Sequence, residues 1–338
     1  MSVGSCTNLA PSNLIAMDFT VIIPSRNRPL LLRKAIDSVL MQTYPYVEIL
    51  VVNDGSDGEN EQAYASLEHE LNGRVRFLNL EQARNGHGPS GATNRGADLA
   101  QGEFLCFLDD DDYWIDPDHL NRAHQCLQMY HGDAEVYFAN QSAYLDDVLV
   151  PGPIWLEPLE SMVRTNGVAD SMGSYQASLP QLMVCPGFCH LNTTIVSREL
   201  YVRIGSMDEN IRYENDLDFY LRIIDNARGI RYYPGIVSRH NVPDMNKSTN
   251  ASTVLSHYRK MLFRGYVWDK AYLFSHSDVI RRNAAKNKGY TLKKIAMSLA
   301  QEKRFGESFY YARQALATGM TAKWLGYCGY LGLRAAIQ

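Results

Sequence analysis

Expected strands and helices alternate along this 338-residue chain up to about Asn241. Short runs rich in β-branched and aromatic residues predict strands at residues 19–23, 47–52, 75–80 and 103–108. Periodic or small-residue segments predict helices at residues 29–41, 59–71, 91–100 and 117–130, the last capped by Asp116. Strand–helix–strand units of this length favour a mostly parallel sheet with right-handed crossovers. The pattern therefore predicts an α/β fold in which helices flank a central sheet.

Four consecutive aspartates end the fourth expected strand. The apolar run that precedes them ends at Leu108, and the next residues are Asp109, Asp110, Asp111 and Asp112. Four like charges at the end of a buried strand repel one another and raise one another's pKa unless a cation neutralises them. Ligands of open α/β sheets bind at the carboxyl ends of the strands. The run predicts a divalent cation and a substrate at this edge, and a solvated acidic surface is the alternative.

Two other expected strands also end in polar residues. Pro24 to Arg28 follow the first strand, and Asn53 and Asp54 follow the second. Because the carboxyl ends of parallel strands meet at one edge of a sheet, these groups are expected to surround one ligand. An ordinary turn role is the alternative for Asp54. The loop of residues 85–89 contains two glycines and is a weak candidate for phosphate binding.

Composition and charge limit the kind of protein that this chain can be. A net charge of −4 argues against a general nucleic-acid binder, which needs a basic surface. The hydrophobic content of 46% is that of a globular chain with a sizeable core. The six cysteines have no disulfide-framework spacing, so reduced thiols are expected. Residues 1–17 lack the pattern of a signal peptide, and no apolar run is long enough to span a membrane, so a cytoplasmic location is expected.

The second half contains two further candidate residues. Asp216 begins an expected helix that reaches Asn226, and the helix dipole there favours an ionised carboxylate. We therefore expect Asp216 to be deprotonated near neutral pH. His240 follows an expected strand at residues 230–237 and could complete a metal site or contact a phosphate. A loop histidine is the alternative.

Five segments, in their order and spacing, resemble a family 2 inverting glycosyltransferase of the GT-A fold. They are Val21 to Pro29, Gln42 to Pro45, Ile49 to Ser56, Leu108 to Asp112 and Asn215 to Arg222. The resemblance covers residues 18–240. It implies a Rossmann-like GT-A domain at residues 17–245, between an N-terminal tail at residues 1–16 and a helical C-terminal region at residues 246–338.

The resemblance also implies a donor site. Its expected residues are Pro24, Ser25, Arg26, Asp54, Asn94, Asp109 and Asp110. Asp54 would accept a hydrogen bond from uracil N3 if the donor is a UDP-sugar, and Asn94 would contact phosphate or ribose. In the family the first residue of the Asn53–Asp54 pair is usually Asp, but the second carboxylate is kept here.

A metal and a base complete the implied site. Asp111 would bind Mn²⁺ or Mg²⁺ directly, with Asp109 beside it and His240 as a possible further ligand, because hard cations prefer oxygen ligands. Asp112 is expected to be a neighbour on the side of the following helix. Asp216 would be the general base that deprotonates the acceptor hydroxyl. Glu214 is the alternative base, because the family's Glu-Asp-X-Asp motif is altered here.

These expectations describe an enzyme that moves a sugar from a nucleotide-diphosphate donor, most simply a UDP-sugar, to a hydroxyl of a glycan or lipid-linked glycan. The process would be polysaccharide or cell-surface glycan synthesis. One alternative is a nucleotidyltransferase, although Pro24 to Arg28 contain none of the glycines expected of its phosphate loop. The other is a catalytically silent protein that binds nucleotide sugars or acts as a scaffold.

The C-terminal region is expected to be helical at residues 257–274, 290–303, 305–318 and 322–336. Before these helices, Asp244 to Ser252 are a candidate lid over the donor. The last helix could lie on the inner face of a membrane, which would make the protein a peripheral one. Packing of this helix on the preceding helices as a bundle is the favoured alternative. Residues 290–318 are similar to a tetratricopeptide hairpin, which would suit protein contact or a homo-oligomer.

Overall fold

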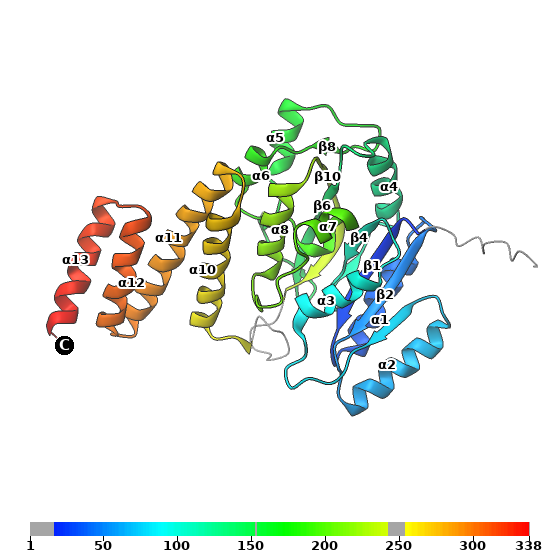
Figure 1. Cartoon of the computed structure of the whole chain (residues 1–338), viewed down its shortest axis with the longest axis horizontal. Coiled ribbons are helices and arrows are strands. Elements are labelled where there is room, and N and C mark those ends of the chain that lie inside the picture. The colour runs from blue at the N-terminus through cyan, green and yellow to red at the C-terminus, as the bar shows by residue number, and fades with distance from the viewer. Residues whose placement is uncertain (1–16, 153, 243–253, 338) are drawn as a thin grey trace, which may run out of the picture.

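In the computed structural model, the described residues are 17–152, 154–242 and 254–337, and ten strands within them form one sheet (Figure 1). The strand order is β3-β2-β1-β4-β9-β6-β10-β5, with β7 beside β6 and β8 beside β10. The strands are β1 (Phe19–Ser25), β2 (Val47–Asn53), β3 (Arg76–Asn79), β4 (Phe104–Phe107), β5 (Tyr113–Trp114), β6 (Val136–Leu145), β7 (Val148–Leu149), β8 (Tyr175–Gln176), β9 (Thr194–Ser197) and β10 (Ile230–Asn241).

Twelve described α-helices accompany the sheet. They are α1 (Pro29–Leu40), α2 (Gly58–Leu71), α3 (Gly88–Leu99), α4 (His119–Met129), α5 (Leu159–Asn166), α6 (Leu179–Val184), α7 (Arg198–Arg203), α8 (Asn215–Asn226), α10 (His257–Phe274), α11 (Asp278–Gln301), α12 (Phe305–Thr318) and α13 (Ala322–Ile337). A 3₁₀ turn at Leu191–Thr193 precedes β9.

The sheet has a parallel half and a mixed half. Strands β3, β2, β1 and β4 are parallel, as the alternation of strands and helices predicts. Strand β9 runs antiparallel between β4 and β6, and β10 is parallel to β6. The α/β fold class is confirmed. The direction of β9 was not predictable, because a short apolar run carries no information about its partners.

Two hydrophobic cores cover the two faces of the sheet. Alternate residues of a strand point to opposite faces, so Val21 and Ile23 pack with α1, α2 and α4, while Ile22 packs on the other face near α3. The approach of α3 is close: a Cβ on Gly96 would lie 2.7 Å from Cγ2 of Ile22. The small residues of α3 therefore let this helix lie directly on β1 and β2.

The start of α4 and the end of β10 are among the element boundaries that differ from the prediction. Helix α4 begins at His119, because Asp116 accepts the backbone N–H of Asp118 at 3.0 Å and pairs with Arg122 at 2.7 Å instead of capping a helix. Strand β10 continues to Asn241, beyond the predicted end at residue 237, because His240 stays in register with Ala143 of β6.

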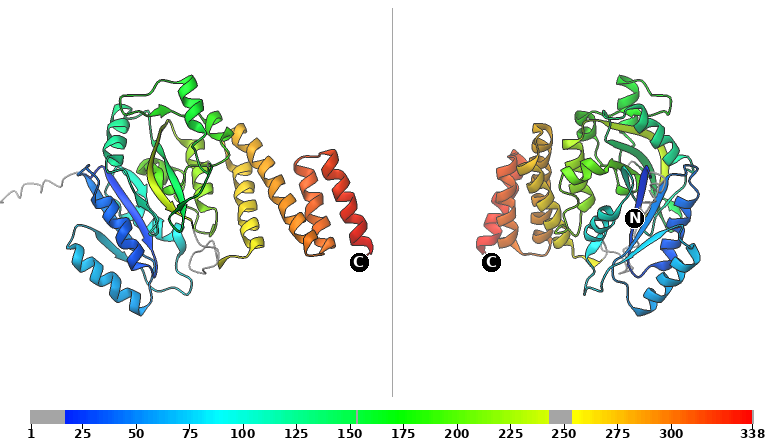
Figure 2. Two further views of the ribbon diagram at one scale, coloured as in Figure 1. Left: turned by 180° about the vertical axis from the view of Figure 1, so that it is seen from behind. Right: turned by 45° about the vertical axis from the view of Figure 1, so that its right-hand side comes forward.

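Helices α10 to α13 follow one another away from the sheet, and the C-terminus lies at the far end of the row (Figures 1 and 2). The first part of this row belongs to the core of the sheet domain, since Trp268 of α10 and Ile280 of α11 are buried in it. Helix α11 begins at Asp278, twelve residues before the predicted Tyr290. Its first turns are polar, so the hydrophobic pattern did not indicate them. Ser277 caps the helix by accepting the backbone N–H of Val279.

The last two helices form a separate apolar cluster with the end of α11. Trp324, Cys328 and Leu331 of α13 are buried in it, at the spacing of one helix face. This is the bundle packing that the sequence favours. Among the described helices, none combines the length and apolarity needed to cross a bilayer. The predicted tail at residues 1–16 and the predicted lid at residues 244–252 both lie outside the described residues. The proposed domain limits, membrane contact and oligomer remain predictions.

Candidate active site

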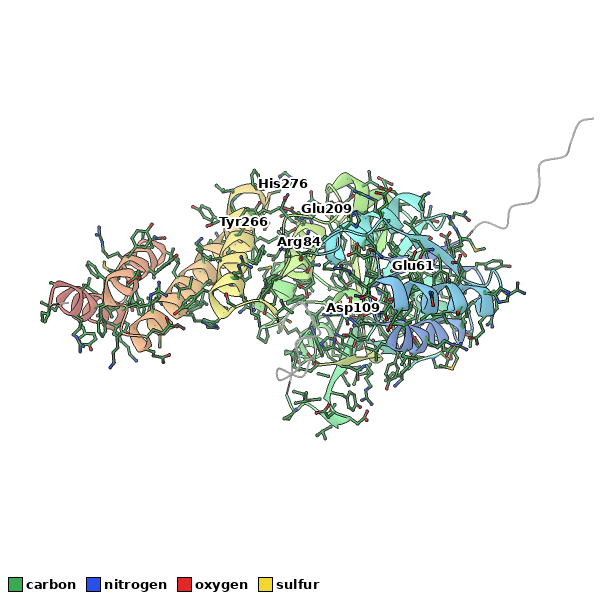
Figure 3. All side chains as sticks on the ribbon, turned by 90° about the horizontal axis from the view of Figure 1, so that it is seen from below. Glu61, Arg84, Asp109, Glu209, Tyr266 and His276 are labelled. Atoms are coloured by element: carbon green, nitrogen blue, oxygen red, sulfur yellow. The ribbon has the colours of Figure 1, made fainter. Side chains whose placement is uncertain are left out.

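The acidic run lies where the carboxyl ends of the parallel strands meet. Ser25 at the end of β1 donates a hydrogen bond of 2.6 Å from Oγ to Asp110 Oδ2, joining two of the strand ends that the sequence predicts to converge. Figure 3 labels Asp109 in the part of the molecule built by the sheet, far from the last helices. Pro24 precedes Ser25 in β1 and is paired in register with Val52 of β2.

Arg28 neutralises part of the acidic run. Its Nη1 lies 3.1 Å from Asp110 Oδ1 and 2.8 Å from Asp111 Oδ2. Burial raises the pKa of Asp110 to about 7, although the charge of Arg28 opposes this shift. Arg28 was within the motif read from the sequence but received no role. Its position just after β1 could have indicated this contact, because a cation at the end of a neighbouring strand faces the aspartates.

The remaining carboxylates fit a divalent cation. Oxygens of Asp109, Asp111 and Asp112 all lie within 4.8 Å of one another. Burial and then the charges of neighbouring aspartates raise the pKa of Asp109, and burial and Asp112 do the same for Asp111. A bound cation would favour the charged form of each of these three crowded carboxylates. Carboxylate oxygens are also the ligands that Mn²⁺ and Mg²⁺ prefer.

Asp112 is a buried anchor and not a neighbour of the following helix. Its side chain accepts the backbone N–H of Asn241 at 2.6 Å and Nδ2 of Asn192 at 2.5 Å. It also lies 2.7 Å from Nδ1 of His240. The expected position of Asp112 was wrong because its partners come from β10 and the 3₁₀ turn, which are distant in sequence.

His240 belongs to an aromatic group beside the acidic run. Its ring centroid lies 4.9 Å from that of His190 and 5.4 Å from that of Trp155. Burial lowers the pKa of His240, but the hydrogen bond and charge of Asp112 outweigh it and raise the pKa overall. Burial lowers the pKa of His190 to about 3, so this ring is neutral. Asp112, His190 and His240 form a second group with metal-ligand spacing. His190 and Trp155 were not among the residues predicted for this site.

A loop covers the expected nucleotide-base pocket. Asp54 is buried and accepts the backbone N–H of His87 at 2.8 Å and that of Gly88 at 2.9 Å. Arg26 donates from Nη2 to the carbonyl of Ala83 at 3.2 Å. Gly86 has a positive φ of 63° and lies against the Asp54 carboxylate, where a Cβ would collide. The glycines of this loop thus serve its contact with Asp54, and the base contacts of Arg26 and Asp54 remain predictions.

Asn94 is occupied by protein contacts. Its Oδ1 accepts from Tyr201 Oη at 2.6 Å and from the N–H of Met207 at 3.0 Å. Its Nδ2 donates to the Met207 carbonyl at 3.0 Å and to Glu209 at 2.9 Å. These bonds hold the segment before α8 against α3, and nothing in this geometry supports the predicted donor contact.

The two candidate bases have different surroundings. Asp216 lies in the first turn of α8, where burial and the charge of Glu214 raise its pKa to about 6 and the charge of His240 opposes this shift. Burial thus outweighs the helix dipole, and the carboxylate is still largely ionised at pH 7 or above. Glu214 accepts a hydrogen bond of 2.9 Å from Nε of Arg264 in α10, which commits it to an ion pair.

Part of the chain matches a known protein family. The model of the family described as "Glycosyl transferase family 2" matches residues 20–140, which span β1 to the middle of β6. Residues 20–140 belong to glycosyltransferase family 2. A curated relative of this family 2 domain is the succinoglycan biosynthesis protein ExoW of Rhizobium meliloti (strain 1021), 31% identical over 205 residues. The match covers 59% of this chain and 58% of ExoW, so the chain spans less than two thirds of this relative.

Solved structures extend the similarity of the family 2 domain beyond the matched residues. TarS 1-349 of S. aureus, solved in complex with UDP-GlcNAc, is 16% identical with a TM-score of 0.64, covering 94% of this chain and 88% of that one. The mannosyltransferase PcManGT from Pyrobaculum calidifontis, in complex with GDP-Man and Mn²⁺, is 19% identical with a TM-score of 0.57, covering 98% and 89%. These likenesses establish the GT-A type fold.

Proposed function

We propose that this chain is a metal-dependent, inverting glycosyltransferase that moves a sugar from a nucleotide-diphosphate donor to a hydroxyl group. The observation that carries the proposal is that His240 links two carboxylate groups: it contacts Asp112 of the acidic run and interacts with the charge of Asp216. The acidic run follows β4, and Asp216 begins α8, close enough to His240 for their charges to interact. A leaving-group site and a base are the two parts that a single displacement of this kind requires.

Asp109, Asp111 and Asp112 are the proposed holders of Mn²⁺ or Mg²⁺, with His240 as a further candidate ligand. When bound, the cation neutralises the charge that develops on the leaving diphosphate. The presence of Mn²⁺ in the PcManGT complex supports this assignment. Arg28 already lies against Asp110 and Asp111, so its guanidinium is positioned to contact the same anionic group.

A UDP-sugar is the proposed donor, supported by the UDP-GlcNAc complex of TarS. Ser25, Arg26 and Asp54 line the strand ends where the nucleotide would lie, provided that the loop at residues 83–88 moves from Asp54. The hydrogen bonds of this loop are exchangeable for bonds to the uracil edge, because Asp54 is an acceptor in both states.

Asp216 is the proposed general base. At neutral pH its carboxylate can accept the proton of an acceptor hydroxyl as the oxygen attacks the anomeric carbon. Direct attack from the face opposite to the leaving diphosphate inverts the anomeric configuration. Glu214 is the weaker candidate, because transferring a proton to it would break a buried ion pair with Arg264.

The proposed acceptor is a glycan or lipid-linked glycan in polysaccharide synthesis, which the likeness to the succinoglycan protein ExoW supports. The proposed location is the cytoplasm, with peripheral contact at the inner membrane face where the acceptor is lipid-linked.

A panel of nucleotide sugars tests this function. We expect one donor to bind the full-length chain by calorimetry only with Mn²⁺ or Mg²⁺, and to be hydrolysed slowly to nucleoside diphosphate without acceptor. Asp111→Ala should lose both the binding and the hydrolysis, while exposed Asp98→Ala retains both. Tight metal-dependent binding with no turnover on any acceptor would instead identify a catalytically silent sugar-nucleotide binder.

A further inference from the structure

A cavity of about 590 Å³ lies where the sheet domain meets the C-terminal helices. Helix α6 and the loop after it form one wall, α8 forms another, and α10 and α11 form the third. Its volume is in the range of small-molecule sites. Glu214 lines it, two residues before the proposed base, so a ligand in this cavity lies next to the start of α8.

The charged residues of this cavity favour an anion. Its lining contains three cations, Arg264, Lys286 and Lys294, and one anion, Glu214, which leaves an excess of two positive charges. Arg264 is paired with Glu214. Lys286 and Lys294 extend from one face of α11, and in the described part of the chain neither is within 4 Å of a carboxylate. These two ammonium groups are therefore available to a ligand.

A buried hydroxyl group gives a second, independent indication. Tyr220 of α8 lines the cavity and is only 3% exposed. Its Oη has no hydrogen-bond partner among the described residues. A buried hydroxyl without a partner destabilises a protein, so such groups are uncommon unless a ligand or water satisfies them. Phe188 packs 5.9 Å from the Tyr220 ring, centroid to centroid, and holds it in place.

We propose that this cavity binds a phosphate or diphosphate group of the acceptor. The inference rests on the proposed function, because it assigns the cavity to the substrate that Asp216 activates. Lysines on flexible stems act as point charges suited to phosphate, whereas planar recognition of a carboxylate favours arginine, and the only arginine here is already paired. The anion is not the donor's diphosphate, which belongs at the acidic run. The cavity therefore selects acceptors that carry their own phosphate.

Two acceptor sources share this chemistry, and calorimetry on the full-length chain in EDTA distinguishes them. Geranyl diphosphate represents a lipid-linked acceptor, and glycerol 3-phosphate represents a phosphate within a glycan or polymer. We expect saturable binding of at least one probe, and the tighter one identifies the source. Geraniol, which lacks the anion, should bind at least about tenfold more weakly than geranyl diphosphate. Absence of saturable binding by both phosphorylated probes overturns the proposal.

Matched variants locate the binding. Lys286→Ala/Lys294→Ala should weaken the better probe about tenfold or more, while Arg282→Ala/Lys293→Ala, with the same charge change on the same helix but outside the lining, should change it less than about twofold. Equal weakening by both pairs overturns the proposal, because it would reflect only the general charge of α11. If the first pair does not fold, each single variant should still weaken binding several-fold, about threefold or more.

Tyr220→Phe tests the hydroxyl. It should weaken the probe about three- to tenfold with an unchanged melting temperature, since no protein hydrogen bond is lost. Unchanged binding would remove Tyr220 from the site. Metal-dependent UDP binding should be unaffected in all these variants; if the wild type lacks it, the proposed function fails while the result for the cavity stands.

Discussion

At the scale of single residues, Asp112 differs from Asp110 and Asp111 in its partners. Asp112 is 1% exposed and holds β10 and the 3₁₀ turn to the end of β4 through three hydrogen-bond partners. Asp110 and Asp111 face Arg28 instead. Mutating Asp112 is therefore expected to destabilise the site as well as to remove a proposed metal ligand, whereas mutating Asp111 is expected to change mainly what the site binds.

Asp112→Ala is expected to lower the free energy of unfolding by about 2–4 kcal/mol, because buried donors of Asn192 and Asn241 lose their acceptor. Chemical denaturation in EDTA measures the loss. Asp98→Ala, at an exposed position of α3, is the control and should stay within about 0.5 kcal/mol of wild type. A loss below about 1 kcal/mol for Asp112→Ala would contradict the anchoring role.

Asp216→Asn should keep metal-dependent donor binding and lower the transfer rate by about 10²–10⁴-fold, the usual contribution of a general base. Steady-state kinetics and calorimetry on the same variant separate the two effects. Glu214→Gln is the matched comparison and should have the smaller effect on rate. A larger loss for Glu214→Gln would mean that the base has been assigned to the wrong carboxylate.

The transfer rate should depend on pH through Asp216. Its pKa is raised to about 6, and a base acts only when deprotonated, so the rate falls about tenfold per pH unit below 6 and reaches a plateau above about 7. The measurement is a kcat profile from pH 5 to 8 at saturating metal. The residual activity of Asp216→Asn should not fall below pH 6 in this way. If the fall persists in this variant, it is caused by a group other than Asp216.

At the scale of elements, the sequence was informative where the pattern is local. The apolar strands β1, β2 and β4 and their polar ends follow from hydrophobicity alone, and so does the position of the acidic run. The start of α11 was missed because its first turns are polar, and β9 could not be oriented. The roles of Asp112, His190 and Arg28 depend on partners from distant strands, which no local pattern specifies.

Helix α3 supplies a test of packing at this scale. Gly96→Ala should lower the free energy of unfolding by about 1–3 kcal/mol, because the new methyl group would overlap Ile22. Gly326→Ala in α13, where a Cβ meets no atom within 4 Å, should instead raise stability by about 0.5–1 kcal/mol. Thermal and chemical denaturation measure both. Equal effects at the two positions would contradict the close approach of α3 to the sheet.

At the scale of the whole molecule, the C-terminal helices do more than extend the chain. Helix α10 contributes Arg264, which holds Glu214 beside the proposed base, and α11 contributes the two free lysines of the cavity. The sequence predicted these helices but not their contact with α8, because the contacting residues are widely separated along the chain. If the cavity binds the acceptor's phosphate as proposed, the sheet domain supplies the donor site and the two parts together supply the acceptor site.

The reaction proposed for this site is direct displacement of a nucleoside diphosphate by a hydroxyl group. The most direct test needs no acceptor, because water can replace it. Proton NMR can record the first free sugar that the full-length chain releases, with Mn²⁺, from a donor whose sugar is α-linked. We expect the β anomer to be released first, before mutarotation, and no sugar to be released by Asp111→Ala. Initial release of the α anomer, or no release from any nucleotide sugar, would contradict it.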